Sequence, residues 1–224
     1  MKASLTPATV RDDAFVALLR QDVAVHHATA VRRLRAIAES CQELMRFPVD
    51  EPIMHSAYAF GAVLDGTGDQ DFVQVAFVLD VPTDELTWGT RPRSYPWLAH
   101  QLRLDRTPVD SYWRPAAWPV SNHVIRRPLR IWSTDGVDER ALDALTRGEA
   151  APFRLPAPSG DELVAQLATE LDASLAHLKR VRDGFWERDW RAEHKGDGIH
   201  PEQYLWDAVH GYLDLLEAAE AGER

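Results

Sequence analysis

Two aspartates near residue 70 are the side chains of this sequence most able to act together chemically. Asp69 and Asp71 flank Gln70 and stand directly before the largely apolar run 72–79. Residues two apart on an extended strand point to the same face, so the two carboxylates would project together. Paired carboxylate oxygens are ligands that a hard divalent cation such as Mg²⁺ prefers. Asp69 and Asp71 are therefore candidate metal ligands and, in an enzyme, candidate catalytic residues.

A turn offers a simpler role for the same aspartates. Gly66, Thr67 and Gly68 precede them, and glycine followed by aspartate is typical of turns between strands. In that role Asp71 caps a turn before a buried strand and touches no metal. Because short motifs often match by chance, the turn is the favoured interpretation.

The pattern of apolar residues predicts the elements that must position these aspartates. Apolar steps of three and four indicate helices, and alternating or continuous apolar runs indicate strands. Helices are predicted within 8–47, at 96–104 and at 137–147, and strands at 56–64, 71–80 and 127–133. The segment 105–120 holds three prolines and is predicted to be an ordered, irregular loop. The strand 71–80 is apolar on both faces, which predicts a central place in the sheet.

The C-terminal part of the sequence is predicted to be helical. After the proline-containing connector 153–158, one apolar stripe runs from Leu163 to Phe185 in steps of three and four, and Ser159 or Asp161 could cap its start. A last helix begins at Pro201. Its predicted buried face consists of Leu205, Val209, Tyr212, Leu213 and Leu216.

The predicted fold is α+β, with a small mixed or antiparallel sheet flanked by N-terminal and C-terminal helices. We expect two parts. Residues 1–155 form an α+β domain with its N-terminal helices, and residues 156–224 form a helical hairpin packed on it.

The order of these elements resembles the core of the nucleotidyltransferase superfamily, of the kanamycin-nucleotidyltransferase type. The resemblance rests on a helix, a strand ending in Gly61-Ala62, a turn, and a strand preceded by Asp69 and Asp71, over about residues 30–147. It implies a nucleotidyltransferase-like sheet, with Gly61 at the nucleotide phosphates and the two aspartates holding magnesium. The helices after residue 159 would be the C-terminal bundle of that type. The chain also resembles an uncharacterised actinobacterial domain family.

The sequence departs from the nucleotidyltransferase pattern in ways that bear on activity. Ala62 stands where the family has serine, and Gln70 replaces an apolar residue. The family carries a third carboxylate on a later strand, whereas the predicted strand 127–133 has none and Asp135 lies just beyond it. Two carboxylates alone would hold magnesium less firmly and leave the attacking hydroxyl without a base. The sequence therefore favours a non-catalytic binding or interaction protein on this scaffold over a magnesium-dependent nucleotidyltransferase using Asp69 and Asp71.

Arginines and tryptophans supply further candidate ligand contacts. Arg126 and Arg130 belong to a basic cluster that could bind phosphate or an acidic partner, although a solvated strand edge explains them equally well. Four of the eight tryptophans lie between residues 88 and 118 among arginines. Such rings could stack on a planar ligand, but core packing is the favoured role of this tryptophan-rich segment.

Arg188 and His194 form one more short motif. Five residues separate Arg188 from His194, and this spacing resembles the R-x(4–6)-H signature of HEPN ribonucleases. The resemblance implies that the pair acts on a scissile phosphate. Charge at a helix C-terminus is the favoured alternative. A HEPN-like ribonuclease is therefore a second alternative function.

Composition limits the kinds of binding partner and the cellular compartment that we expect for this protein. The net charge of −10 disfavours broad nucleic-acid binding, and Cys41 as the only cysteine excludes a disulfide framework. No apolar run approaches a membrane span or the core of a signal peptide. We therefore expect a cytoplasmic protein without membrane contact. Its expected partners are a second copy through the amphipathic helices, another protein or a nucleotide, with magnesium only in the nucleotidyltransferase alternative.

Overall fold

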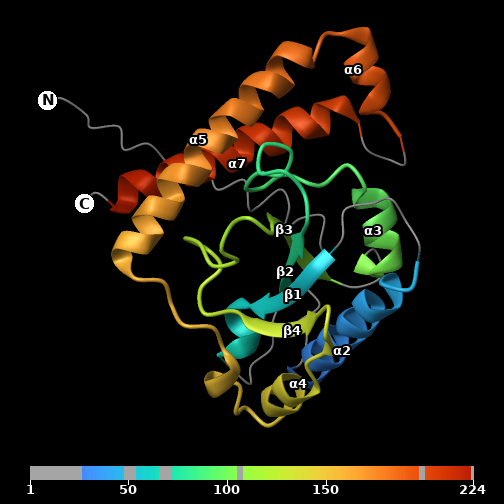
Figure 1. The fold of residues 1–224 in the computed structure, drawn as a ribbon, viewed down its shortest axis with the longest axis vertical. Helices are drawn as coiled ribbons and strands as arrows, with labels where there is room; N and C mark the ends of the chain where they lie inside the picture. The colour runs from blue at the N-terminus through green and yellow to red at the C-terminus, as the bar shows by residue number, and fades with distance from the viewer. Residues whose placement is uncertain (1–26, 48–53, 66–71, 105–107, 197–199, 223–224) are drawn as a thin grey trace, which may run out of the picture.

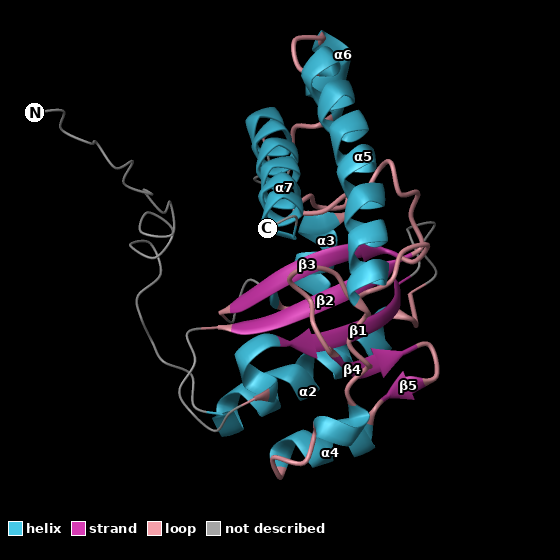
Figure 2. Cartoon of the chain, turned by 90° about the vertical axis from the view of Figure 1, so that its left-hand side faces the viewer, coloured by secondary structure: helices cyan, strands magenta, loops and turns pink. Residues whose placement is uncertain are grey.

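A five-stranded mixed sheet lies between two layers of helices, as Figure 1 and Figure 2 show. The structure is a computed structural model that describes residues 27–47, 54–65, 72–104, 108–196 and 200–222. The strands are β1 (Met54–Phe60), β2 (Val73–Leu79), β3 (Val109–Pro115), β4 (Leu129–Ser133) and β5 (Gly136–Val137). Their order across the sheet is β3-β2-β1-β4-β5. The predicted α+β class with a mixed sheet is confirmed.

The second strand occupies the interior position predicted for it. β2 pairs with β1 in antiparallel and with β3 in parallel orientation. All of its residues except Gln74 are buried, because helices cover the sheet on both sides. A continuous apolar run is typical of a strand buried on both faces, and this pattern made β2 predictable.

The structure corrects the loop predicted for 105–120, because residues 109–115 form the edge strand β3. Pro108 and Pro115 bound the strand, and prolines are tolerated at the ends of edge strands. Helix α3 (Tyr95–Gln101) lies in the crossover between β2 and β3. The predicted strand 127–133 is present as β4, but it pairs with β1 and β5 rather than with β2.

One face of the sheet packs against α2 (His27–Leu44), α3 and α4 (Glu139–Thr146). α2 buries Leu34, Ile37 and Cys41, in agreement with the predicted apolar stripe. The part of the predicted helical zone that precedes α2 lies outside the described residues. Arg35 of α2 forms ion pairs with two carboxylates of α4, which joins these helices side by side.

The other face packs against the long helices α5 (Gly160–Gly184) and α7 (Pro201–Gly222), which run side by side. A capping box of Ser159 and Glu162 starts α5, so Ser159 is the cap of the two that the sequence offered. The short helix α6 (Arg188–Glu193) connects α5 to α7 in the sequence. Two 3₁₀ turns, η1 (Gly61–Leu64) and η3 (Ala151–Phe153), are also present.

The predicted apolar stripe of α5 faces inward, whereas the buried face of α7 differs from the one predicted. On α5, Glu170 and Ser174 are buried, whereas Leu171 and Leu175 are only half-buried. Leu167, Val181 and Phe185 of the predicted stripe are buried, and Glu170 is buried beside them because it pairs with Arg114 of β3. On α7, Ala208, Gly211 and Leu215 are buried and Leu213 is exposed. Small residues face inward on α7 because a loop backbone packs directly against the helix there.

Candidate functional site

Gly61 begins the turn that follows β1. Its φ is +74°, and a Cβ atom at this residue would lie 2.0 Å from Oε1 of Gln74. Gln74 is the second residue of β2 and pairs with Phe60. The positive φ favours glycine here, because any other residue would strain the backbone. The structure therefore places Gly61 at the end of the sheet where β2 begins.

Asp110 is a carboxylate at the same end of the sheet, and no sequence pattern predicted it. Gln74 of β2 is in register with Asp110 of β3, and the Val73 amide donates a hydrogen bond of 3.0 Å to the Pro108 carbonyl. The hydroxyl of Tyr112 donates a hydrogen bond of 2.9 Å to Oδ2 of Asp110. Burial and the neighbouring charge of Asp110 raise the pKa of Tyr112 above its usual range, so the hydroxyl stays protonated and able to donate.

The predicted metal ligands Asp69 and Asp71 lie outside the described residues. In the sequence, Asp71 precedes Val73, the first residue of β2, by two positions. The strand beside β2 is β3, not the strand at 127–133. A carboxylate missing from 127–133 is therefore present on the strand that adjoins β2.

Arg126 and Arg130 lie at or near the same end of the sheet, but toward its other edge. Arg130 is exposed on β4, opposite Tyr58 of β1, and its Nη2 lies 3.6 Å from Oδ2 of Asp138. Nε of Arg126 donates a hydrogen bond of 3.1 Å to the His123 carbonyl. Since β1 and β2 separate β4 from β3, the structure does not bring these arginines next to Asp110.

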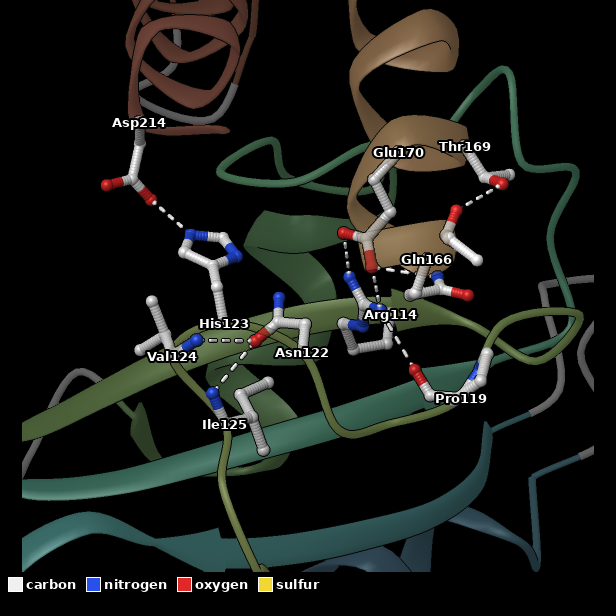
Figure 3. A network of polar contacts seen from close by, with 11 residues as sticks. Arg114, Pro119, Asn122, His123, Val124, Ile125, Gln166, Thr169, Glu170 and Asp214 are labelled. Atoms are coloured by element: carbon white, nitrogen blue, oxygen red, sulfur yellow. Dashed lines mark hydrogen bonds and ion pairs between the residues drawn. The ribbon is translucent and has the colours of Figure 1, made fainter. Parts of the chain in front are cut away.

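A buried ion pair joins β3 to α5 (Figure 3). The guanidinium of Arg114 donates to both carboxylate oxygens of Glu170, each at 2.6 Å, and to the Pro119 carbonyl at 2.8 Å. The guanidinium also lies over the rings of Trp88 and Trp118, 5.8 Å and 5.6 Å from their centroids. Arg114 therefore packs with Trp88 and Trp118 in the interior, as the packing interpretation expects, whereas Arg93 and Arg103 are exposed.

A second polar contact joins α7 to the loop that contains Asn122 and His123 (Figure 3). Nε2 of His123 lies 3.1 Å from Oδ2 of Asp214, and the indole N–H of Trp88 donates to the same oxygen. The hydrogen bond from His123, against the opposing effect of burial, lowers the pKa of Asp214. Oδ1 of Asn122 accepts from the amides of Val124 and Ile125 and so fixes the loop that carries His123.

The two residues of the HEPN-like motif occupy different environments. Arg188 is the exposed first residue of α6. His194 is buried and stacks on Trp190 with ring centroids 3.9 Å apart. Within the described part of the chain, no contact joins Arg188 to His194.

The described residues contain no group of three or more His, Cys, Asp or Glu side chains arranged to hold a metal ion. The set formed by Asp69, Asp71 and Asp110 includes two residues outside the described parts. Its chemistry fits a hard cation, because all three side chains offer carboxylate oxygens.

Comparison with known proteins places the chain in a family. A family model described as "Domain of unknown function (DUF7711)" matches residues 25–221. The chain belongs to the DUF7711 family. No curated protein and no solved structure matches it. The expectation of an uncharacterised domain family is thereby confirmed.

The match to DUF7711 runs from before α2 almost to the end of α7, so it covers the sheet and both helical layers. Across the ranges of this DUF7711 protein that the structure describes, no helix combines the length and apolar character needed to cross a membrane.

Proposed function

We propose that this DUF7711 protein is a magnesium-dependent nucleotidyltransferase whose site lies at the end of the sheet where β2 and β3 begin. The observation that carries the proposal is the position of Asp110 on β3, beside the strand that follows Asp69 and Asp71. The nucleotidyltransferase resemblance implies a third carboxylate on a later strand. Asp110 has the residue type for that role and lies on a later strand that adjoins β2.

The order of elements supports the same scaffold. A helix, a strand ending in glycine, a turn and a second strand follow one another as α2, β1, η1 and β2. In this proposal residues 1–155 form the nucleotidyltransferase-like part and residues 156–224 the helical hairpin. The hairpin helices cover the face of the sheet that carries Tyr112 and Arg114.

The three aspartates and the nucleotide would together bind one divalent cation. Asp69, Asp71 and Asp110 would hold Mg²⁺ through carboxylate oxygens. A bound Mg²⁺ would neutralise charge on the triphosphate and orient it in the site. Gly61 leaves the end of β1 without a side chain, so the phosphates could approach its backbone.

Asp110 would also act as the base for the transfer step. A bond forms between the acceptor oxygen and the α-phosphorus, the bond from that phosphorus to the bridging oxygen breaks, and pyrophosphate leaves. The proton of the acceptor hydroxyl passes to Asp110. Tyr112 holds the carboxylate in place through its 2.9 Å hydrogen bond. Arg126 and Arg130 have no part in this step and stay predicted ligand contacts.

A non-catalytic binding protein on the same scaffold is the second candidate, and Ala62 favours it. Ala62 is exposed and offers no hydroxyl to the phosphates. The nucleotidyltransferases that the chain resembles have a serine at this position. Such a protein would bind the nucleotide with magnesium but release no pyrophosphate with any acceptor.

Calorimetric titration of the full chain with each nucleoside triphosphate tests the proposal. Binding is expected with Mg²⁺ and not with EDTA, and Asp110→Asn should abolish it while the circular dichroism stays unchanged. Asp135→Asn is the matched control, because this exposed aspartate follows β4 on the far side of β1. The proposal fails if no nucleotide binds or if Asp110→Asn binds as tightly as the wild type.

A further inference from the structure

A cavity of about 750 Å³ lies between the 81–94 loop and the helices α5, α6 and α7. The loop starts after Leu79, where β2 ends, whereas Asp110 lies beside the start of β2. The cavity is therefore separate from the proposed nucleotide site. Its volume is within the range of cavities that hold small molecules.

Two histidines of this cavity are held with a nitrogen acceptor free for a ligand. Nδ1 of His177 lies 3.0 Å from the Asp84 carbonyl, and Nδ1 of His194 lies 2.8 Å from the Trp190 carbonyl. A carbonyl oxygen only accepts, so each Nδ1 carries the proton. In its neutral form each ring keeps the lone pair on Nε2, for which no partner exists among the described residues. Burial lowers the pKa of His177, which favours this neutral form.

Carboxylates outnumber guanidinium groups around the cavity. Five carboxylates line it against three guanidinium groups. Asp84 pairs with Arg180 at 3.3 Å, Asp207 with Arg91 at 3.4 Å and Asp183 with Arg182 at 2.7 Å. Of the lining charges in the described residues, these pairs leave Glu85 and Glu187 against Arg93. Within the described ranges, Glu187 has no ion-pair partner. The C-terminal end of α5, where helix carbonyls concentrate negative charge, also borders the cavity at Gly184.

Aromatic rings form one wall of the cavity in a fixed arrangement. Trp190 stacks on His194, and Tyr204 meets the same imidazole edge-on with centroids 4.8 Å apart. A Cβ atom on Gly184 would lie 2.8 Å from Cδ1 of Trp190, so the glycine lets the indole lie against the end of α5. Aromatic faces beside carboxylates attract cations through the ring quadrupole.

We propose that this cavity is a binding site for a small organic cation that carries N–H donors, such as an amidinium or an alkylamine. The two imidazole nitrogens and Glu187 would accept its hydrogen bonds, and the aromatic wall would face its charge. The site is independent of the proposed transferase activity.

Calorimetry of the full chain with benzamidinium and with spermidine tests this proposal, with benzoate as the matched anion. Saturable binding is expected for at least one cation and not for benzoate. Glu187→Gln, which removes one charge at nearly constant size, should weaken binding about five-fold, as expected for one exposed charge pair. Glu217→Gln on α7 is the matched control, because this exposed residue is not among those that line the cavity, and it should leave the affinity unchanged.

Asp110→Asn should retain cation binding even though it abolishes nucleotide binding, so the two sites can be tested separately. A second variant, His194→Phe, keeps an aromatic ring beside Trp190 but removes the nitrogen acceptor, and it should also weaken binding. Failure of both cations to bind, or binding of benzoate as tight as that of benzamidinium, would overturn the proposal. Equal affinities of the Glu187→Gln and Glu217→Gln proteins would do the same.

Discussion

Arg114 on β3 and Glu170 on α5 form a two-pronged ion pair in which neither side chain has any exposed surface. Gln166 donates a further hydrogen bond of 2.8 Å to the Glu170 carboxylate. The pair fixes α5 over the edge strand of the sheet. Each charge depends on the other, because neither can reach water.

Removal of one partner should therefore be costly. Glu170→Gln leaves the Arg114 charge buried without a counter-charge, and the free energy of unfolding should fall by about 3–5 kcal/mol. Urea unfolding followed by circular dichroism measures the loss. Glu149→Gln is the matched control, because this glutamate pairs with Arg147 at the surface and should have little effect. A Glu170→Gln protein as stable as the Glu149→Gln protein would contradict the structural role of the pair.

A close contact between backbones explains the small residues on α7 and gives a second prediction. A Cβ atom on Gly211 would lie 1.9 Å from the Trp88 carbonyl oxygen. Gly211→Ala should destabilise the protein by about 1–3 kcal/mol, because the loop must move away from the helix. Gly222→Ala, in the same helix with open space around it, should be neutral or slightly stabilising. Thermal unfolding of the two variants provides the comparison, and equal midpoints would refute the contact.

These two contacts show what could be predicted from the sequence and what could not. β2 and α5 have apolar patterns that local periodicity reveals, and the glycine at the end of β1 stood at a strand boundary. Glu170 was not expected in the interior, because its partner Arg114 lies 56 residues earlier in the chain. Periodicity registers apolar burial and carries no information about polar side chains that are buried as pairs.

Asp110 was missed for a related reason. Pro108 and Pro115 indicated a loop, although prolines at the ends of an edge strand leave the pairing between them intact. The alternation of Val109, Ser111 and Trp113 with Asp110 and Tyr112 was the available signal for a strand.

The stability of the protein should depend on the ionisation of Asp214. The pKa of this carboxyl is lowered in the folded protein, chiefly by its hydrogen bond from His123. Its stabilising contribution is therefore present above the unfolded-state pKa and is lost as the pH falls through the lower folded value. Below about pH 4, the unfolding free energy of the wild type should fall more steeply than that of Asp214→Asn. Urea titrations from pH 7 to pH 3 test this, and parallel curves for the two proteins would show that the contact has no electrostatic effect.

Cys41 should react slowly with thiol reagents while the protein is folded. The side chain is fully buried in α2, and burial raises the pKa of its thiol. Because the thiolate is the reactive form, an aromatic disulfide reagent should modify Cys41 only after unfolding. The rate of modification, measured in increasing urea, should rise across the unfolding transition. Rapid reaction of one equivalent in native buffer would contradict the packing of α2 on the sheet.

The position of a bound divalent cation tests the proposed transferase site most directly. Crystals grown with Mn²⁺ and a non-hydrolysable nucleoside triphosphate analogue would locate the metal by its anomalous scattering. We predict a manganese ion within about 2.5 Å of a carboxylate oxygen of Asp110, together with Asp69 or Asp71 and phosphate oxygens of the analogue. Manganese at another place, or nucleotide bound without metal at Asp110, would contradict the assignment of this end of the sheet as the site.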